Sequence, residues 1–579
     1  LHPGFIPARI RGLTPPARLV NLGRRTLHDT MREWHISDPP EGQTLMLRYG
    51  WAVVALLIAA LPVCAAPEAG QWIVVTAPAF RKAVEPLCEQ RKKQGLHVVV
   101  VQTSDVLRRE DIRAGRAEKL RKHINKLCSD HKGPSYVLLV GAIESGRLAE
   151  PEKKVLPALA GTIGRMKGQP SDNGYGCLDD GRLPAVPVGR FPARTEEEAR
   201  GMVAKTLEFE RATRPALWRR RLIILAGIPA YNPLVDRMVE SVAMARFARL
   251  SPIWTGRAIY SNPQSRFCVP DDLLHQRALR YVQDGEAFTL YLGHSNAEGL
   301  YGGRARYLDR GDWSRMHIEH GKGVFLTFGC NGCQLKGEQG EGYGVAAMRN
   351  ANGPVAVAGS HGICFAAMVQ LAADGLFAST FAKAPPQRLG ESWLAIKNGV
   401  ARGKIDALTF RLLDAVDGDK TIPQATQRQE HLEMFLLLGD PALRLPRMPA
   451  DVEISAVNTV SPGKKLTVSG KVPSRLAGAR LRITLERTVN SVPEDLAAMP
   501  KAPAEARDRV MLANHERANR FVLTTSESTV KDGRFQATLD VPANLPWRSL
   551  ILRAYAANEH AEGMTVRLLE VKKEATKNP

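Results

Sequence analysis

The sequence predicts an α/β protein with mostly parallel sheets flanked by helices, followed by an all-β sandwich. Two observations carry this prediction. Between residues 71 and 441, short and continuously apolar runs alternate with amphipathic segments, which is typical of buried parallel strands with helices on both faces. From about Ala450 the pattern changes to short strands of alternating polarity without convincing helices between them, which is typical of an antiparallel sandwich.

The composition is that of a globular protein. Of the 579 residues, 44% are hydrophobic and 24% are charged, which excludes disordered, collagen-like and coiled-coil classes. The net charge of +21 favours anionic surroundings such as nucleic acid, polyanionic glycans or acidic substrates. The basic residues are interleaved with acidic ones, as in Arg108-Arg109-Glu110-Asp111, and no nucleic-acid motif accompanies them. We therefore expect no nucleic-acid partner.

The first 66 residues have the pattern of a targeting region. A short basic start at Met46 is followed by an apolar run from Trp51 to Val63 and by small residues, which is typical of a secretory signal. The run is too short to span a bilayer comfortably, so we expect no stable membrane span. We predict that residues 1–45 are an upstream, non-native extension and that residues 46–66 are a signal peptide. The mature chain is then expected in the periplasm, at the cell surface or secreted.

The cysteines do not describe a disulfide framework. Once the signal is removed, an odd and widely spaced set remains, so at least one thiol stays free or pairs with another molecule. The set is Cys88, Cys128, Cys177, Cys268, Cys330, Cys333 and Cys364. A reactive cysteine is therefore worth seeking.

The α/β region divides into two successive units, 67–220 and 221–448, each expected to hold a sheet. Strands of the first unit are expected at 72–76, 97–101, 136–141 and 186–189, with helices at 81–95, 112–128 and after Thr195. Strands of the second unit are expected at 222–225, 288–293, 324–329 and 354–359, with helices at 235–250, 271–284 and 388–402. Residues 449–579 then supply seven short strands, the signature of an immunoglobulin-type sandwich, with 490–519 as a polar surface insertion.

Two strands of the second unit end in residues that can carry chemistry. One ends Gly293-His294-Ser295 and the next ends Gly329-Cys330-Asn331. Ligands of open α/β sheets bind beyond the carboxyl ends of strands, and a glycine before each candidate lets the chain turn there. If the strands are neighbours, a thiol and an imidazole meet, which suits acyl transfer from a peptide bond. Backbone N–H groups after His294 or at Cys330 would hold the oxyanion.

The chain resembles the gingipain family of cysteine peptidases, which are relatives of caspases and legumain. The resemblance runs from Trp72 to about Arg447. It is carried by the number and order of several segments: 72–76 with 91–96, 136–141, Ser171-Asp172-Asn173-Gly174-Tyr175-Gly176, 188–191, Gly293-His294, Cys330-Asn331-Gly332 and Gly439-Asp440-Pro441. The resemblance implies a caspase-like catalytic region and an exported cysteine endopeptidase acting on proteins or peptides. His294 and Cys330 are the implied dyad, with the amides of Ser295 and Cys330 as oxyanion donors.

The sequence departs from that family at several positions. The family usually has Gly after the His and Ala before the Cys, where this chain has Ser295 and Gly329. The acid that orients the family's His falls at Gly227. The Asp by which some members select Arg roughly matches Asp236, which implies a preference for Arg or Lys at the cleaved position.

Other interpretations stay open. The missing orienting acid favours a catalytically silent surface or binding protein, and Cys330-x-x-Cys333 has the spacing of a thiol–disulfide oxidoreductase or of a reversible regulatory disulfide. No cofactor is expected to be required, and no metal site is predicted, because His317-x-x-His320 has no third ligand nearby. A structural calcium ion at Asp179-Asp180 is left open, as is the oligomeric state.

Overall fold

The structure is a computed structural model that describes residues 70–572, apart from 144–147, 149, 180, 212–214, 230–235, 237–239, 242–243, 245–246, 248–249, 304, 339, 447, 456 and 502. The predicted extension 1–45 and signal peptide 46–66 therefore lie outside the described residues. Residues 67–579 group as one compact unit. Among the described residues, no helix is both long and apolar enough to cross a membrane.

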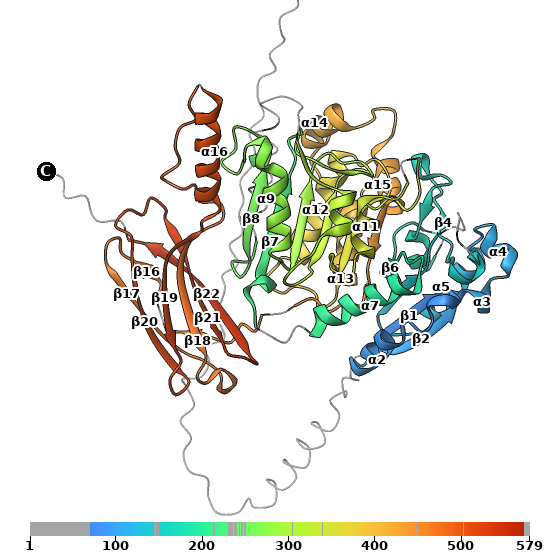
Figure 1. Ribbon diagram of the computed structural model, residues 1–579, viewed down its shortest axis with the longest axis horizontal. Helices are drawn as coiled ribbons and strands as arrows, with labels where there is room; N and C mark the ends of the chain where they lie inside the picture. Colours follow the sequence, from blue (N-terminus) through green and yellow to red (C-terminus); the bar gives the residue numbers. More distant parts are fainter. Residues whose placement is uncertain are drawn as a thin grey trace, which may run out of the picture. The chain divides into compact units, whose positions relative to one another are not determined.

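The α/β region is built on one ten-stranded sheet, not on the two sheets that the sequence suggested (Figure 1). The strands that belong to its first half, in spatial order, are β2 (His97–Gln102), β1 (Gln71–Thr76), β3 (Ser135–Val140), β6 (Val188–Phe191) and β14 (Phe435–Leu438). The second half continues with β13 (Ala356–Ser360), β12 (Val324–Phe328), β9 (Phe288–Leu292), β7 (Arg221–Ala226) and β8 (Thr255–Tyr260).

Strand β14 is what joins the two halves. It pairs parallel to β6, with Leu438 opposite Arg190, and antiparallel to β13, with Val357 opposite Leu438. All other neighbours in the sheet are parallel, so the strands of the two halves run in opposite directions. The prediction of two separate sheets was wrong because β14 comes last in the α/β region and inserts between strands made long before it.

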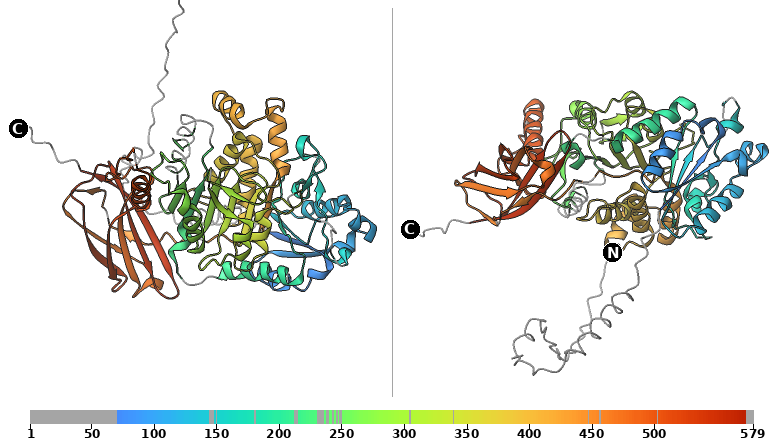
Figure 2. Two further views of the ribbon diagram at one scale, coloured as in Figure 1. Left: turned by 45° about the horizontal axis from the view of Figure 1, so that its top comes forward. Right: turned by 90° about the horizontal axis from the view of Figure 1, so that it is seen from below.

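Helices cover both faces of this sheet, as Figures 1 and 2 show. Odd and even positions of each strand point to opposite faces, which is why the strands are apolar throughout. On one face, the core contains side chains of α2 (Glu85–Lys93), α7 (Glu196–Arg211), α9 (Asp271–Gln283), α10 (Arg310–Arg315) and α11 (Tyr343–Arg349). On the other face, the cores contain side chains of α5 (Glu118–Ser129), α12 (Ala366–Ser379), α13 (Leu389–Arg402) and α15 (Gln424–Met434).

The remaining elements of the α/β region are short connections. The helices are α3 (Thr103–Val106), α4 (Arg109–Arg113), α6 (Pro151–Lys154) and α14 (Ala407–Asp417). The strands form two small ribbons, β4 (Leu159–Ala160) with β5 (Pro170–Ser171), and β10 (Gly299–Tyr301) with β11 (Arg306–Asp309). The 3₁₀ turns are 78–80, 164–166, 173–176 and 217–220. Of the predicted helix 235–250, most residues lie outside those described.

A buried ion pair fastens the first half of the sheet. Arg91, on α2, donates to Asp440 Oδ2 from Nε (3.0 Å) and from Nη2 (2.7 Å), and Trp72 Nε1 donates to Oδ1 (3.0 Å). Arg91 Nη1 also lies 2.8 Å from Glu210 on α7. Three distant segments of the chain therefore share one fully buried carboxylate, directly after the strand β14.

The C-terminal region is rich in strands, which form two mostly antiparallel sheets packed over one hydrophobic core. The first sheet contains β15 (Glu453–Ile454), β17 (Lys465–Lys471) and β20 (Arg534–Asp540). The second contains β16 (Thr459–Val460), β22 (Glu562–Val571), β21 (Ser549–Ala557), β18 (Arg480–Arg487) and β19 (Val522–Thr529), and a 3₁₀ turn lies at 474–476.

The predicted surface insertion 490–519 is partly wrong, because it ends in helix α16 (Ala504–Asn519), which packs against the α/β region. His515 of this helix is fully buried. Its Nε2 lies 2.9 Å from the hydroxyl of Tyr281 on α9, and its Nδ1 lies 2.9 Å from the Phe267 carbonyl oxygen. Asn519 exchanges hydrogen bonds with the backbone of Ala258 on β8. A polar sequence thus forms a docking helix by pairing its polar groups.

Candidate active site

The two candidate residues leave the same edge of the sheet. β9 and β12 are adjacent and parallel, with Leu292 opposite Phe328, so His294 and Cys330 each follow two residues beyond this pair. The glycine between strand and candidate is needed at 293, where φ is +151° and an added Cβ would lie 2.9 Å from the Gly227 amide nitrogen. The prediction that these strands are neighbours is confirmed.

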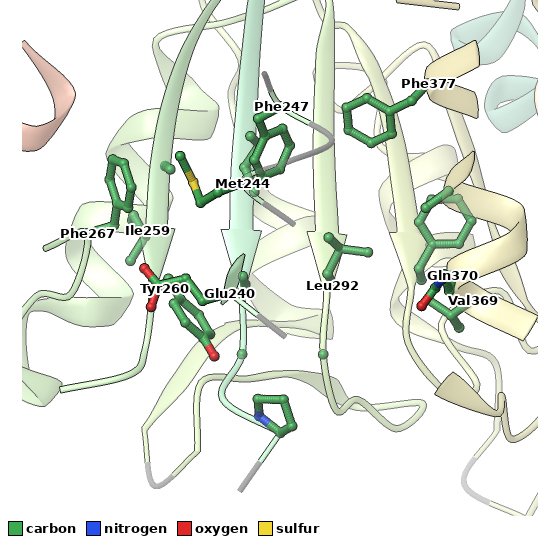
Figure 3. A pocket seen from close by; sticks show the side chains of 18 of the residues that line it. Glu240, Met244, Phe247, Ile259, Tyr260, Phe267, Leu292, Val369, Gln370 and Phe377 are labelled. Atoms are coloured by element: carbon green, nitrogen blue, oxygen red, sulfur yellow. The ribbon is translucent and has the colours of Figure 1, made fainter. Parts of the chain in front are cut away.

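Both side chains line a single cavity of about 300 Å³. Its wall includes the strand-end residues Gly227, Leu292 and Phe328 as well as Cys364. Figure 3 shows Leu292 at the end of its strand, with Val369, Gln370 and Phe377 facing it from helix α12. The cavity is mostly apolar, so water around a reacting group there is restricted, which strengthens electrostatic interactions inside it.

His294 is exposed, and its imidazole is oriented by the backbone. Its Nε2 lies 3.1 Å from the carbonyl oxygen of Pro229, which is two residues beyond Gly227. The His294 carbonyl oxygen in turn accepts hydrogen bonds from the Tyr291 hydroxyl and from the Tyr301 amide (3.0 Å). The imidazole ring therefore contacts a backbone carbonyl at residue 229. The family resemblance had led us to seek a carboxylate at the nearby position 227. Sequence reasoning missed the carbonyl because a backbone acceptor has no side-chain signature.

Cys330 is half-buried. It packs against the hydrophobic core that contains side chains of α12, α13 and α15. Burial raises the pKa of its thiol, and the charge of Asp417 raises it further, while the Cys364 carbonyl and the charge of Arg165 lower it. Its Sγ lies 4.0 Å from the Cys364 carbonyl oxygen. The resting thiol is therefore protonated at neutral pH and needs a base to become a nucleophile.

Backbone donors for an oxyanion stand beside this thiol. Ser295 follows the histidine and is buried, and its amide and that of Cys330 enter no hydrogen bond outside the strand ladders among the described residues. By contrast, the next amide, that of Asn331, is used, because it donates to the Gly362 carbonyl at 2.9 Å. Two such N–H groups are what a tetrahedral acyl intermediate requires.

The structure does not place Asp236 in the cavity wall. Asp236 is only 4% exposed, and the Tyr260 hydroxyl donates to its backbone oxygen at 3.3 Å. The acidic side chain that lines the cavity on the same segment is Glu240, which accepts a hydrogen bond of 2.7 Å from Ser265 Oγ. Glu240 follows Asp236 by four positions in the sequence.

The other sulfur and imidazole candidates are structural. All seven described cysteines are free thiols, and burial raises the pKa of Cys333 and of Cys364 well above the ordinary range. His361 accepts from the Leu335 amide at 3.1 Å, and burial lowers its pKa to about 4, so it stays neutral. A buried Cys333 does not suit an oxidoreductase, whose two thiols must be reached by a partner.

Metal ligation finds no support in the part of the chain that the structure describes. No group of three or more His, Cys, Asp or Glu side chains there could hold a metal ion. Asp179, one half of the pair considered for calcium, instead accepts a hydrogen bond of 2.8 Å from the Gly181 amide of its own turn. Asp180 lies outside the described residues, and no step of the chemistry is derived through calcium.

Comparisons with known proteins agree with this fold. The profile of peptidase family C25 matches residues 65–446. The crystal structure of the Arg-specific cysteine proteinase gingipain R is similar, with 14% identity, a TM-score of 0.50 and coverage of 88% of this chain and 100% of that one. The complex of Porphyromonas gingivalis RgpB pro- and mature domains has 15% identity, a TM-score of 0.49 and coverage of 87% and 100%. A comparison with curated proteins gave no significant match.

An α/β sheet of this kind, with a thiol at one strand end, defines the class as cysteine-type peptidases, which are hydrolases. Within that class, the chain belongs to peptidase family C25, the gingipain family. The resemblance drawn from the sequence is thereby confirmed.

Proposed function

We propose that this protein is an exported cysteine endopeptidase in which Cys330 is the nucleophile and His294 transfers the protons. The observation that carries the proposal is that the two residues follow adjacent parallel strands and line one cavity. The reaction class is inferred from membership of the family. The choice of Cys330 and His294 is inferred from their position in the cavity.

The reaction follows from these groups. His294 takes the proton of the Cys330 thiol, and the thiolate attacks the scissile carbonyl carbon to form a tetrahedral intermediate. The negative oxygen is held by the amides of Ser295 and Cys330. The C–N bond then breaks as His294 returns the proton to the leaving amine, which leaves an acyl thioester on Cys330. Water, deprotonated by His294, attacks the thioester, and the acid product leaves as the thiol is restored.

The decisive experiment uses a peptide chloromethyl ketone and a peptide library on the full mature chain. We expect the probe to label Cys330, labelling to be lost in Cys330→Ala and His294→Ala, and Cys88→Ala, a buried thiol on α2, to behave as wild type. Correctly folded protein that is never labelled and never cleaves a peptide supports the silent surface or binding protein instead. Activity that depends on both Cys330 and Cys333 supports the oxidoreductase.

Specificity for Arg or Lys is part of the proposal, with a changed recognition residue. Glu240 and Asp417 both line the cavity, and Glu240, four positions after Asp236, supports recognition of a basic side chain in place of Asp236. Most of the interior is apolar, which suits the aliphatic stem of Arg or Lys while the acid meets its charged end.

The location and the accessory region complete the proposal. The secretory pattern at 46–66 supports export to the periplasm, the cell surface or the medium. The two-sheet C-terminal region supports an immunoglobulin-like sandwich that braces the α/β region, since α16 and β8 share hydrogen bonds. No cofactor is needed for the steps above. Detection of the mature N-terminus after expression and fractionation tests the export.

A further inference from the structure

The peptide unit that follows the proposed nucleophile is held at both of its polar ends. Its carbonyl, that of Cys330, accepts a hydrogen bond of 2.7 Å from Ser295 Oγ. Its N–H, that of Asn331, donates to the Gly362 carbonyl at 2.9 Å. Asn331 has φ of +58°, a left-handed conformation that asparagine adopts more readily than other non-glycine residues. The orientation of this peptide plane therefore fixes the direction in which the Cys330 side chain leaves the backbone.

The Ser295 hydroxyl is itself held by a buried chain of hydroxyl groups. The Tyr343 hydroxyl donates to Ser295 Oγ at 3.4 Å, and Tyr343 and Thr327 share a hydrogen bond of 2.5 Å. Ser295, Thr327 and Tyr343 are all buried, so bulk water does not compete for these bonds. The Ser295 hydroxyl therefore donates to the Cys330 carbonyl, and the hydrogen bond that it accepts from Tyr343 fixes its rotamer.

Gly329 is what makes room for this hydroxyl. A Cβ at position 329 would lie 2.2 Å from Ser295 Oγ, 3.0 Å from its Cβ and 2.9 Å from the Gly293 carbonyl oxygen. Contacts this short force something to move. The serine after the histidine and the glycine before the cysteine thus fill one shared volume between the ends of β9 and β12, and neither residue is independent of the other.

We propose that Ser295 is a positioning residue: its hydroxyl sets the Cys330 carbonyl, and so the direction of the thiol, and Gly329 is required to admit that hydroxyl. This inference rests on the proposed function, in which Cys330 is the nucleophile. The bond joins the segment that bears His294 to the segment that bears Cys330, so the imidazole and the sulfur keep their relative placement. Misplacement by about 1 Å can cost about 100-fold in rate.

The test compares five variants: Ser295→Ala, Ser295→Gly, Gly329→Ala, the double variant Ser295→Gly with Gly329→Ala, and the control Ser314→Ala. Ser314 is an exposed serine whose hydroxyl also donates to a backbone carbonyl, at 2.8 Å. Two rates are measured for each: kcat and KM for peptide cleavage, and the second-order rate of Cys330 alkylation by iodoacetamide. The unfolding midpoint is recorded for every variant.

We expect Ser295→Ala to lower kcat by about 10- to 100-fold with little change in KM, and to lower the alkylation rate at neutral pH. Gly329→Ala should lower kcat and the alkylation rate more than Ser295→Ala does, because the added methyl group displaces both the Ser295 hydroxyl and the Cys330 backbone. The double variant should recover toward, and at most to, the level of Ser295→Gly alone, since the contacts with the serine side chain have gone while the 2.9 Å contact with the Gly293 carbonyl oxygen stays. Such non-additivity is the signature of two residues in contact.

The proposal is overturned if Ser295→Ala keeps both rates within about twofold of wild type while only its unfolding midpoint falls, since that is the behaviour of a merely structural hydroxyl. It is also overturned if kcat and the alkylation rate fall by the same factor in Gly329→Ala and in the double variant. If the wild type itself cleaves no peptide, the proposed function fails, but the alkylation rates still decide whether Ser295 positions Cys330. If Gly329→Ala does not fold, Ser295→Ala alone carries the decision.

Discussion

The Nε2 atom of His294 lies 3.1 Å from the carbonyl oxygen of Pro229. A carbonyl only accepts hydrogen bonds, so in this contact Nε2 of His294 carries a proton and donates it. The Pro229 carbonyl therefore helps to orient the ring, two residues beyond Gly227, the position at which the family has its acid.

Replacing the imidazole should remove most of the activity. We expect His294→Ala to lower kcat/KM for peptide cleavage by about 100- to 10,000-fold, the usual worth of a general acid–base. The side chain is exposed, so the unfolding midpoint should stay near that of wild type. His317→Ala, another exposed histidine, is the matched control. Full activity of His294→Ala in steady-state assays would remove this residue from the mechanism.

Alkylation of Cys330 should be strongly pH dependent. Because burial raises the pKa of this thiol above 9.0, the thiolate fraction is small at neutral pH and grows as the pH rises. In the background of His294→Ala, we expect the iodoacetamide rate to increase steadily through pH 9. The other described thiols are buried, so they should react only after unfolding. A rate already at its plateau at pH 7 would contradict the raised pKa.

Recognition of a basic substrate side chain should depend on Glu240. We expect Glu240→Gln to lower kcat/KM for Arg and Lys substrates by about 10- to 100-fold, the value of one charged hydrogen bond, and to spare substrates with uncharged residues there. Asp236→Asn is the competing arm, and Asp271→Asn on the exposed start of α9 is the control. A loss confined to Asp236→Asn would restore the residue chosen from sequence, and no loss in either would reject basic specificity.

The buried pair of Arg91 and Asp440 should be costly to break. We expect Asp440→Asn to lower the free energy of unfolding by about 3–5 kcal/mol, because it leaves the Arg91 guanidinium buried with less compensation. Glu85→Gln removes one partner of the exposed Arg81 pair and should cost at most about 1 kcal/mol. Urea denaturation measures both. Equal losses in the two variants would show that burial does not govern this pair.

Lys397 should make stability depend on pH. Burial lowers its pKa to about 7, although its ammonium group donates to Asn173 Oδ1 (3.0 Å) and to the carbonyls of Leu432 and Phe435. Between pH 7 and pH 10.5 the unfolded chain binds this proton and the folded chain does not, so stability should rise with pH over that window. Lys397→Met should flatten that rise in urea-midpoint measurements. An unchanged slope would assign the pH dependence elsewhere.

Several elements could be predicted from sequence because their signal is local. The apolar runs at β1, β3, β9 and β12 are buried on both faces, so periodicity alone marks them, and their glycine-terminated ends pointed to His294 and Cys330. Two of the segments that carried the family resemblance meet in space, since Asp172 accepts two hydrogen bonds of 2.7 Å from Arg190.

The rest depends on contacts between distant residues or on backbone groups. Nothing in residues 435–438 says that they insert between β6 and β13, which is why one sheet was taken for two. The Pro229 carbonyl has no side-chain signal. In the sequence, Ser295 and Gly329 are two separate small departures from the family pattern. The structure shows that they are coupled, because a Cβ added at position 329 would lie 2.2 Å from Ser295 Oγ.

The position of β14 has a consequence for biogenesis. Among the strands that the structure describes, β14 alone joins the half of the sheet that bears Cys330 to the N-terminal half, so the two can pair only after residue 438 has emerged. Until then both halves present an open edge strand, a surface prone to aggregation. A nascent chain would therefore remain dependent on chaperones, and without proteolytic power, for most of its synthesis, which delays the appearance of a destructive enzyme until almost its whole polypeptide exists.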